Sequence, residues 1–396
     1  MPDADQGKPR RLAGCANDKV NQVSKRIGVV TGGGDCPGLN AVIRAVAKAS
    51  ANRGWECIGI LGGYEGLLEP QRTIPLDNRT LSGLLPRGGT ILGTANRGKF
   101  SAKVGHGESR ALPKELLEGV KSGMDALGLF ALISIGGDGS LNIAQQLFEH
   151  GIPVVGVPKT IDNDLEGTLF TFGFDSAVSC ATDALDRLHT TAESHDRVMV
   201  LEVMGRYAGW IALYAGVAGG ADVILIPEIP FSFESVCAKI QQRENLGKKF
   251  TIIIVAEGAC ERDGDFVTSG AHNRIGEAQL GGIGGVVCAE IETCIGKESR
   301  VCVLGHLQRG GSPTAFDRAL CSIFGATAVE LVADSDFGKM VAFTGPQFGA
   351  IKISDAIGKL KVVRPDGNLV RTARALGICF GDYWPNVPNS PTRWIH

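Results

Sequence analysis

Three aspartates occupy two short polar loops, each of which follows a run of apolar residues. Asp138 lies in the segment GGDGS (136–140), and Asp162 and Asp164 lie in PKTIDND (158–164). Two carboxylates spaced by two residues lie on one side of an extended loop, so one can accept a proton while the other serves a metal ion. An aspartate has an ordinary pKa of about 3.9 and is therefore ionised at neutral pH. The pattern indicates proton transfer beside a bound cation.

Both loops also have a purely structural interpretation. Asp138 is either a magnesium-linked residue among phosphates or the N-cap of the helix that follows it. Asp and Asn side chains also make turns, but two aspartates, an asparagine and Lys159 in one loop exceed what a turn needs. We favour the catalytic interpretation for the second loop and keep both interpretations open for the first.

A third loop, TGGGDCPGLN (31–40), opens onto the segment AVIRAVAKAS (41–50), which has the composition of a helix. Glycines without a Cβ let backbone N–H groups approach an anion, and a helix N-terminus adds unpaired donors and a favourable dipole. The loop matches neither GxxxxGK[ST] nor GxGxxG. It predicts a phosphate site, although a glycine turn that serves backbone geometry alone would have the same composition.

These loops must be positioned by strands, and short runs rich in β-branched residues precede them. The runs alternate with segments of helix length, which predicts parallel strands joined by right-handed crossovers in doubly wound (Rossmann-like) α/β sheets. Open parallel sheets bind ligands at the carboxyl ends of their strands, and six of the eight runs lead directly into polar or glycine-rich sequence. The predicted strands are 26–31, 56–60, 130–135, 152–157, 198–203, 223–226, 251–256 and 301–304.

The composition excludes several other classes of protein. The chain has 396 residues, 44% of them hydrophobic, and a formal net charge of -2, so it offers no basic surface for nucleic acid. No apolar run is long enough to span a membrane. The first 25 residues are polar and mixed in charge, and we expect a flexible tail with no secretory signal. The 11 cysteines form no CxxC pair, which is typical of reduced thiols in a cytoplasmic protein.

Five motifs together resemble the phosphofructokinase family in order and spacing. They are TGGGDCPGLNAVIR, GGDGS, PKTIDND, RVMVLEVMGRYAGW and VLGHLQRGGSPTAFDR, and the resemblance runs from about residue 25 to residue 324. It implies an Mg²⁺-dependent enzyme that transfers a phosphoryl group to the 1-hydroxyl of fructose 6-phosphate. It also implies two lobes that face each other across a cleft. The donor lobe would comprise 26–173 plus about 308–360, and the fructose 6-phosphate lobe 174–307 plus about 361–390.

The resemblance also implies roles for individual residues. Asp162 corresponds to the base that receives the proton of the sugar hydroxyl, Thr160 lies close to the phosphoryl group, and Lys159 and Arg206 complete the catalytic set. The implied metal ligands are Asp138 and Asp164. The implied donor contacts are Gly33, Gly34, Asn96, Arg97, Gly137, Asp138, Gly139 and Ser140. The implied sugar-phosphate contacts are Thr160, Asp162, Asp164, Arg197, Met204, Gly205, Arg206, Glu257, Arg300, His306 and Arg309.

Some of these contacts imply an oligomer. In the family, the residues at Arg197 and Arg300 reach in from a neighbouring subunit, so we expect a homo-oligomer, either a dimer or a tetramer. The bacterial pattern has an arginine where Asn96 stands, and Arg97 could replace it. Other positions concern allosteric effectors: Arg44 and Lys48 could hold an effector phosphate, whereas His189 stands near where an arginine is usual.

Two residues, Gly139 and Lys159, indicate different phosphoryl donors. In the family, pyrophosphate users typically carry Asp where Gly139 stands and Lys where Lys159 stands, whereas bacterial ATP enzymes carry glycine at both positions. Gly139 leaves space for the α-phosphate and nucleoside of ATP. A carboxylate there would repel a phosphate about 4 Å away by about 4 kcal/mol at an effective dielectric constant of about 20. We therefore expect ATP, with pyrophosphate or ADP as the alternative.

Two functions of other classes are weighed against this one. A non-catalytic regulatory subunit that binds sugar phosphate would lose the catalytic base, but here Asp138, Asp162 and Asp164 are all present. A lipid or NAD kinase could share the GGDG loop, but it would not explain PKTIDND or GHLQRGG. The expected partners are thus fructose 6-phosphate and ATP.

Overall fold

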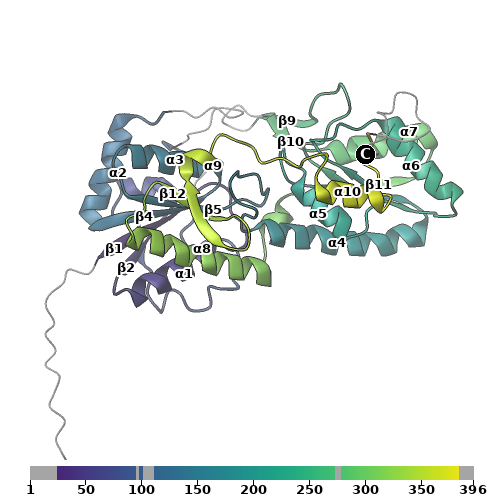
Figure 1. The fold of residues 1–396 in the computed structure, drawn as a ribbon. Coiled ribbons are helices and arrows are strands. Elements are labelled where there is room, and N and C mark those ends of the chain that lie inside the picture. The colour runs from purple at the N-terminus through teal and green to yellow at the C-terminus, as the bar shows by residue number, and fades with distance from the viewer. Residues whose placement is uncertain (1–24, 95–97, 101–110, 273–277, 383–396) are drawn as a thin grey trace, which may run out of the picture.

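Two mainly parallel β-sheets, one in each half of the molecule, organise the structure (Figure 1). The computed structural model describes residues 25–94, 98–100, 111–272 and 278–382. Nearly all of the predicted N-terminal tail lies outside these residues. Within them, no helix is long and apolar enough to cross a membrane. The cysteines in this part of the chain are all free thiols, as expected.

The first sheet has seven strands in the order β13-β12-β5-β4-β1-β2-β3. The five inner strands are parallel, and β13 and β3 are antiparallel edges. In chain order the strands are β1 (Arg26–Thr31), β2 (Glu56–Ile60), β3 (Thr73–Pro75), β4 (Leu129–Gly136), β5 (Val154–Pro158), β12 (Lys339–Phe343) and β13 (Phe348–Lys352).

Helices cover both faces of this sheet. Successive side chains of each strand point to opposite faces, so each strand contributes apolar side chains to both cores. In β1, Ile27 and Val29 belong to the core shared with α1 (Leu39–Asn52) and α8 (Ala315–Ala333). Val30 points into the core on the opposite face. That second core is closed by α2 (Lys114–Leu127), α3 (Asp138–Glu149) and the 3-10 helix η1 (Gly63–Leu68).

The second sheet has four parallel strands in the order β11-β6-β8-β7. The helices α4 and α5 pack on one face, and α6 and α7 on the other. The elements of this lobe are α4 (Phe174–His195), β6 (Val198–Val203), α5 (Trp210–Ala218), β7 (Val223–Leu225), α6 (Phe233–Asn245), β8 (Thr251–Ala256), α7 (Ile283–Ile295) and β11 (Ser299–Val303). A separate antiparallel pair is formed by β9 (Thr268–His272) and β10 (Ala278–Leu280).

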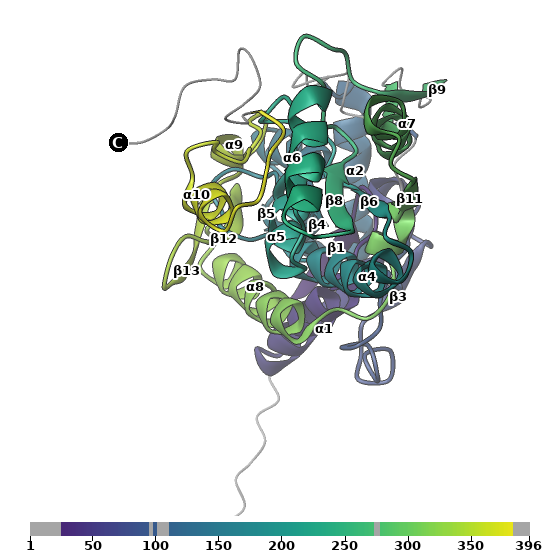
Figure 2. The same cartoon turned by 90° about the vertical axis from the view of Figure 1, so that its right-hand side faces the viewer.

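The C-terminal part of the chain contributes to both lobes. The 3-10 helix η2 (Gly305–Arg309) leads from the second lobe back to α8, and β12 pairs with β5. After α9 (Ile353–Ala356) the chain returns to the second lobe, where α10 (Asn368–Ala375) lies and Cys379 pairs with Val223. Figure 2 shows α9 and α10 on the same side of the molecule.

The predicted α/β class with mainly parallel sheets is confirmed. All eight predicted strands are present. β1, β2, β6 and β8 have the predicted bounds, and the other four differ by one or two residues at one or both ends. The strands β3, β9, β10, β12 and β13 were not predicted. A functional division into a donor lobe and a sugar-phosphate lobe stays a prediction at this point.

The helices α1 and α8 of the first lobe pack closely against each other at a glycine. Gly325 of α8 faces α1, and a Cβ atom at Gly325 would lie 2.6 Å from the Cβ of Ala45 and 3.0 Å from the carbonyl oxygen of Val42. Gly285 in α7 is the contrasting case, because a Cβ there would meet nothing within 4 Å. Both glycines lie in α-helices, but only Gly325 has close neighbours.

We predict that Gly325→Ala lowers the free energy of unfolding by about 1–3 kcal/mol, because the added methyl group overpacks the contact between α1 and α8. Gly285→Ala is the matched control and should raise it by about 0.5–1 kcal/mol, since alanine favours a helix. Calorimetry on both variants measures the difference. Equal shifts in the two variants would contradict the close contact.

Candidate active site

The glycine-rich loop after β1 lies against two cations from distant parts of the chain. The Nζ atom of Lys159 donates a hydrogen bond to the carbonyl oxygen of Gly34. The Nη1 atom of Arg309 donates to the carbonyl oxygen of Asp35 at 3.2 Å. A Cβ atom at Gly34 would lie 2.4 Å from that guanidinium nitrogen, so a side chain there would displace the guanidinium group. Two positive charges therefore gather at the carboxyl end of β1.

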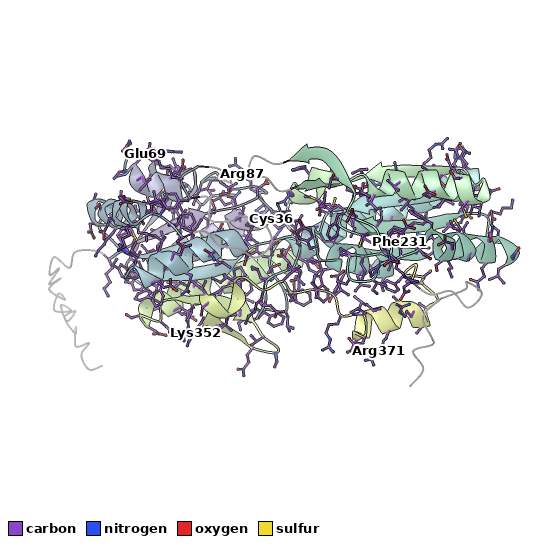
Figure 3. The ribbon with its side chains drawn as sticks, turned by 90° about the horizontal axis from the view of Figure 1, so that it is seen from above. Cys36, Glu69, Arg87, Phe231, Lys352 and Arg371 are labelled. Atoms are coloured by element: carbon purple, nitrogen blue, oxygen red, sulfur yellow. The ribbon has the colours of Figure 1, made fainter. Side chains whose placement is uncertain are left out.

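Cys36 lies in the same loop, at the centre of the molecule where the two lobes meet (Figure 3). Its thiol is fully buried and lies 3.8 Å from the carbonyl oxygen of Phe172. Burial raises the pKa of Cys36 to about 12. The thiol is thus a packing group and not a nucleophile.

The loop after β4 begins α3. Gly137 is the N-cap and makes no side-chain cap bond, and Asp138 is the first residue of the helix. The carboxylate of Asp138 accepts a hydrogen bond from the backbone N–H of Gly358 at 2.9 Å. The N-cap alternative for Asp138 is therefore wrong.

Gly139, which follows Asp138, is half-buried. The next residue, Ser140, is buried, and its carbonyl oxygen accepts a 2.8 Å hydrogen bond from the Tyr64 hydroxyl.

The loop after β5 is held by its own polar side chains. The Oγ1 atom of Thr160 accepts a hydrogen bond from the backbone N–H of Asp162 at 3.1 Å. The Oδ1 atom of Asn163 accepts from the N–H of Thr171 at 3.0 Å, and Asn163 has a left-handed backbone (φ 52°). Thr160 and Asn163 thus do make the turn bonds that the structural interpretation offers. Asp162 does not.

The carboxyl group of Asp162 is buried, with 6% of the residue exposed, and its Oδ1 atom has no hydrogen-bond partner in the described residues. Burial raises the pKa of Asp162 to about 7. Asp164 and Glu257 raise it further by repulsion, and Arg309 and Arg206 oppose the rise by attraction. A buried carboxylate without a donor is unfavourable, so burial favours the protonated form of Asp162.

The loop after β6 carries the predicted residues Met204, Gly205 and Arg206. The backbone N–H of Arg206 donates to the carboxylate of Glu257, which follows β8, at 3.1 Å. The N–H of Met204 donates to the Oε1 atom of Gln308 in η2 at 2.9 Å. Gln308 is fully buried and was not predicted, although it lies between two predicted residues in the GHLQRGG motif.

Charged residues of both lobes therefore meet around Asp162. Lys159, Asp162 and Asp164 come from the end of β5 in the first sheet, whereas Arg206 and Glu257 come from the ends of β6 and β8 in the second. Parallel strands end at the same edge of a sheet, which explains how separate loops converge. His306 lies in η2 near this edge and is exposed.

Two predicted residues lie elsewhere. Arg197 precedes β6, and Arg300 is the second residue of β11, so both lie at the opposite end of their sheet from Arg206. A six-residue strand separates the two ends by about 20 Å. Both arginines pair with Glu298, at 2.8 Å from the Nε of Arg197 and 2.5 Å from the Nη2 of Arg300.

The remaining predictions concern the metal and the segment 95–97. Asn96 and Arg97 lie outside the described residues. In the part of the chain that the structure describes, no three His, Cys, Asp or Glu side chains are arranged to hold a metal ion. Asp138 lies in the first turn of α3, and Asp164 lies in the loop after β5.

Comparisons with known proteins identify the family. The Phosphofructokinase family model matches residues 26–332. An ATP-dependent 6-phosphofructokinase of Chloroflexus aurantiacus is 55% identical over 358 residues, which cover 90% of this chain and 98% of the relative. A pyrophosphate--fructose 6-phosphate 1-phosphotransferase of Streptomyces coelicolor is 50% identical over 343 residues, which cover 86% and 96%.

A solved structure agrees with these relatives. Phosphofructokinase from Saccharomyces cerevisiae superimposes with a TM-score of 0.72 at 30% identity over 84% of this chain. The match covers 44% of the yeast chain, so the present chain spans less than half of its length. The fold, the five motifs and the matched range lead to one conclusion: this chain belongs to the phosphofructokinase family.

Proposed function

We propose that this enzyme transfers a phosphoryl group from ATP to the 1-hydroxyl of fructose 6-phosphate, with Asp162 as the general base. The observation that carries the proposal is the buried carboxylate of Asp162, whose Oδ1 atom has no partner in the described residues. It lies among charges from both lobes. A sugar hydroxyl would give Oδ1 the hydrogen bond that the protein does not.

The raised pKa suits a base. With a pKa of about 7, Asp162 is ionised in a substantial fraction of molecules at neutral pH and holds a proton more readily than an ordinary aspartate. The hydroxyl proton can therefore move to Oδ1 as the sugar oxygen becomes nucleophilic. Positioned general bases contribute about 10² to 10⁴ in rate.

The cations beside the glycine-rich loop would stabilise the charge of the phosphoryl group. Phosphoryl transfer depends mainly on positioning and on positive charge around the transferred group. Lys159 and Arg309 already lie against the backbone of Gly34 and Asp35. Burial lowers the pKa of Lys159, so an anion beside it would favour its charged form. Thr160 would lie next to the transferred group.

The loops of the second lobe would hold the sugar phosphate. The backbone N–H of Arg206 holds the carboxylate of Glu257, so a guanidinium group and a carboxylate lie on neighbouring loops of this lobe. The residues that we assign to this side are Met204, Gly205, Arg206, Glu257, His306 and Arg309. Arg197 and Arg300 lie far from Asp162, and we assign them to the sugar-phosphate site of a neighbouring subunit in a homo-oligomer.

We assign Mg²⁺ to Asp138 and Asp164, together with donor phosphate oxygens. Carboxylate oxygens are the hard ligands that this ion prefers. When bound, the ion would neutralise phosphate charge. The first lobe would hold the donor and the second the sugar phosphate, and we expect the enzyme to act in the cytoplasm.

Gly139 supports ATP over pyrophosphate. Overall identity does not decide the donor, since relatives named for ATP and for pyrophosphate are 55% and 50% identical to this chain. Gly139 lies in the first turn of α3, directly after Asp138, and has no side chain to fill the space that a nucleotide requires. Pyrophosphate remains the second candidate because of the Streptomyces coelicolor relative.

We predict that Asp162→Asn lowers kcat by about 10² to 10⁴ with little change in KM for fructose 6-phosphate, because the amide cannot accept the proton. Asp186→Asn, at an exposed position of α4, is the control for loss of one negative charge and should retain full activity. A coupled assay of fructose 1,6-bisphosphate measures both. A loss below tenfold in Asp162→Asn would remove this residue as the base.

We predict that wild-type enzyme is fastest with ATP when ATP, ADP and pyrophosphate are compared by initial rates. Gly139→Asp should lower kcat/KM for ATP by about 10³-fold and raise the ratio of pyrophosphate to ATP activity, since the carboxylate repels the nucleotide phosphates. Gly139→Ser separates size from charge and should lose less. Equal losses with both donors in Gly139→Asp would contradict this account of the donor site.

A further inference from the structure

Residues 358–363, which we call the strap, carry the chain from α9 in the first lobe to α10 in the second. Figure 1 shows this yellow segment crossing between the lobes. The strap lies beyond residue 332, where the family match ends. None of its residues was predicted as a site residue, yet its contacts reach the loops that carry Asp138 and Asp164.

The strap backbone joins the two aspartate loops. The N–H of Gly358 donates to the carboxylate of Asp138 at 2.9 Å, and the N–H of Lys361 donates to the carbonyl oxygen of Asp164 at 2.9 Å. Between them, Leu360 forms an antiparallel bridge with Leu165. Three residues of chain span at most about 11 Å. One short segment therefore holds both loops in a fixed relation.

The Lys361 side chain also donates hydrogen bonds to the loop of Asp162 and to the residues that follow it. Its Nζ atom donates to the Oδ1 of Asn163 at 3.0 Å and to the carbonyl oxygens of Thr168 at 2.9 Å and Leu169 at 3.0 Å. The ammonium group has three donors, so all three are used. Asn163 is the neighbour of Asp162, so these bonds hold the loop directly beside Asp162.

The strap is also bound to the second lobe. The Nε1 of Trp210 donates to the carbonyl oxygen of Lys361 at 2.9 Å, and the Lys361 ammonium lies 5.6 Å from the centroid of the indole ring. The N–H of Val363 donates to the carboxylate of Glu228 at 2.8 Å, which also accepts from Gly209 at 2.9 Å. Gly209 and Trp210 directly follow the loop of Arg206. The strap thus connects the loops of both lobes.

We propose that Lys361 is a positioning residue that holds the PKTIDND loop so that Asp162 faces the second lobe. The proposal rests on the role of Asp162 as the base. Lys361 reaches the loop through Asn163 and through backbone oxygens, and not through the carboxyl group of Asp162. Its removal would therefore leave the base present but displaced, and a displacement of about 1 Å can lower a rate by about 10²-fold.

The test begins with Lys361→Met, which keeps an unbranched side chain one atom shorter and removes its donors. We expect kcat to fall by about 10²-fold while KM for ATP and for fructose 6-phosphate changes by less than about threefold. Lys361→Arg should recover part of the loss, because it restores charged donors. Lys359→Met, at an exposed position of the strap, is the matched control and should match wild type. Unchanged kcat in Lys361→Met would overturn the proposal.

A second arm separates positioning from general support of the fold. In the Asp162→Asn background, Lys361→Met should lower kcat no further, since the base that it positions is absent. An equal loss in both backgrounds would overturn the positioning role and leave Asp162 as the base. Full activity of Asp162→Asn alone would instead contradict the proposed function.

A third arm applies if Lys361→Met does not fold. Trp210→Phe keeps an aromatic ring and removes the N–H that holds the Lys361 carbonyl oxygen, together with part of the indole that the Lys361 ammonium faces. We expect it to lower kcat in the wild-type background and not in the Asp162→Asn background. Wild-type kcat in Trp210→Phe would then overturn the proposal.

Discussion

Burial of the Asp162 carboxylate is the constraint on which the rest of the site depends. In the ligand-free protein its Oδ1 atom has no donor in the described residues, and burial raises its pKa to about 7 from the ordinary value near 3.8. The folded state therefore holds a proton that the unfolded state has lost between about pH 4 and pH 7. Stability from this group is greatest below that range and falls as pH rises through it. Under the proposed function, a substrate hydroxyl would supply the hydrogen bond that Oδ1 lacks in the ligand-free protein.

The architecture explains how such a carboxylate is kept in place. The ends of β1, β4 and β5 carry the glycine-rich loop and the aspartates, and the ends of β6 and β8 carry Arg206 and Glu257. Two connections tie these edges together. One is η2, in which the buried Gln308 binds the backbone of the second lobe and Arg309 binds that of the first. The other is the strap, which binds loops of both lobes. The charges around Asp162 include Arg309 and Glu257, so its surroundings depend on residues far apart in the chain.

The central strands and their loops could be predicted from the sequence, whereas residues whose role depends on distant contacts could not. Buried parallel strands such as β4 and β8 are nearly continuous apolar runs, so their positions could be predicted. β3 has three residues and β13 is a partly exposed edge, and neither has that pattern. The polar loops were found because they follow strands directly. Gln308 could have been suspected from its neighbours His306 and Arg309. Lys361 could not, because its partners lie about two hundred residues earlier and no local motif marks it.

The most direct measurement is the titration of the Asp162 carboxyl group itself in the ligand-free enzyme. Carbon-13 NMR of protein labelled at the aspartate γ-carbon, with the signal assigned by its absence from Asp162→Asn, follows this group alone. We expect a midpoint near pH 7, well above the ordinary value for an aspartate. A midpoint near pH 4 would mean that the carboxylate is solvated or paired in the folded protein, and it would contradict the buried base on which the account rests.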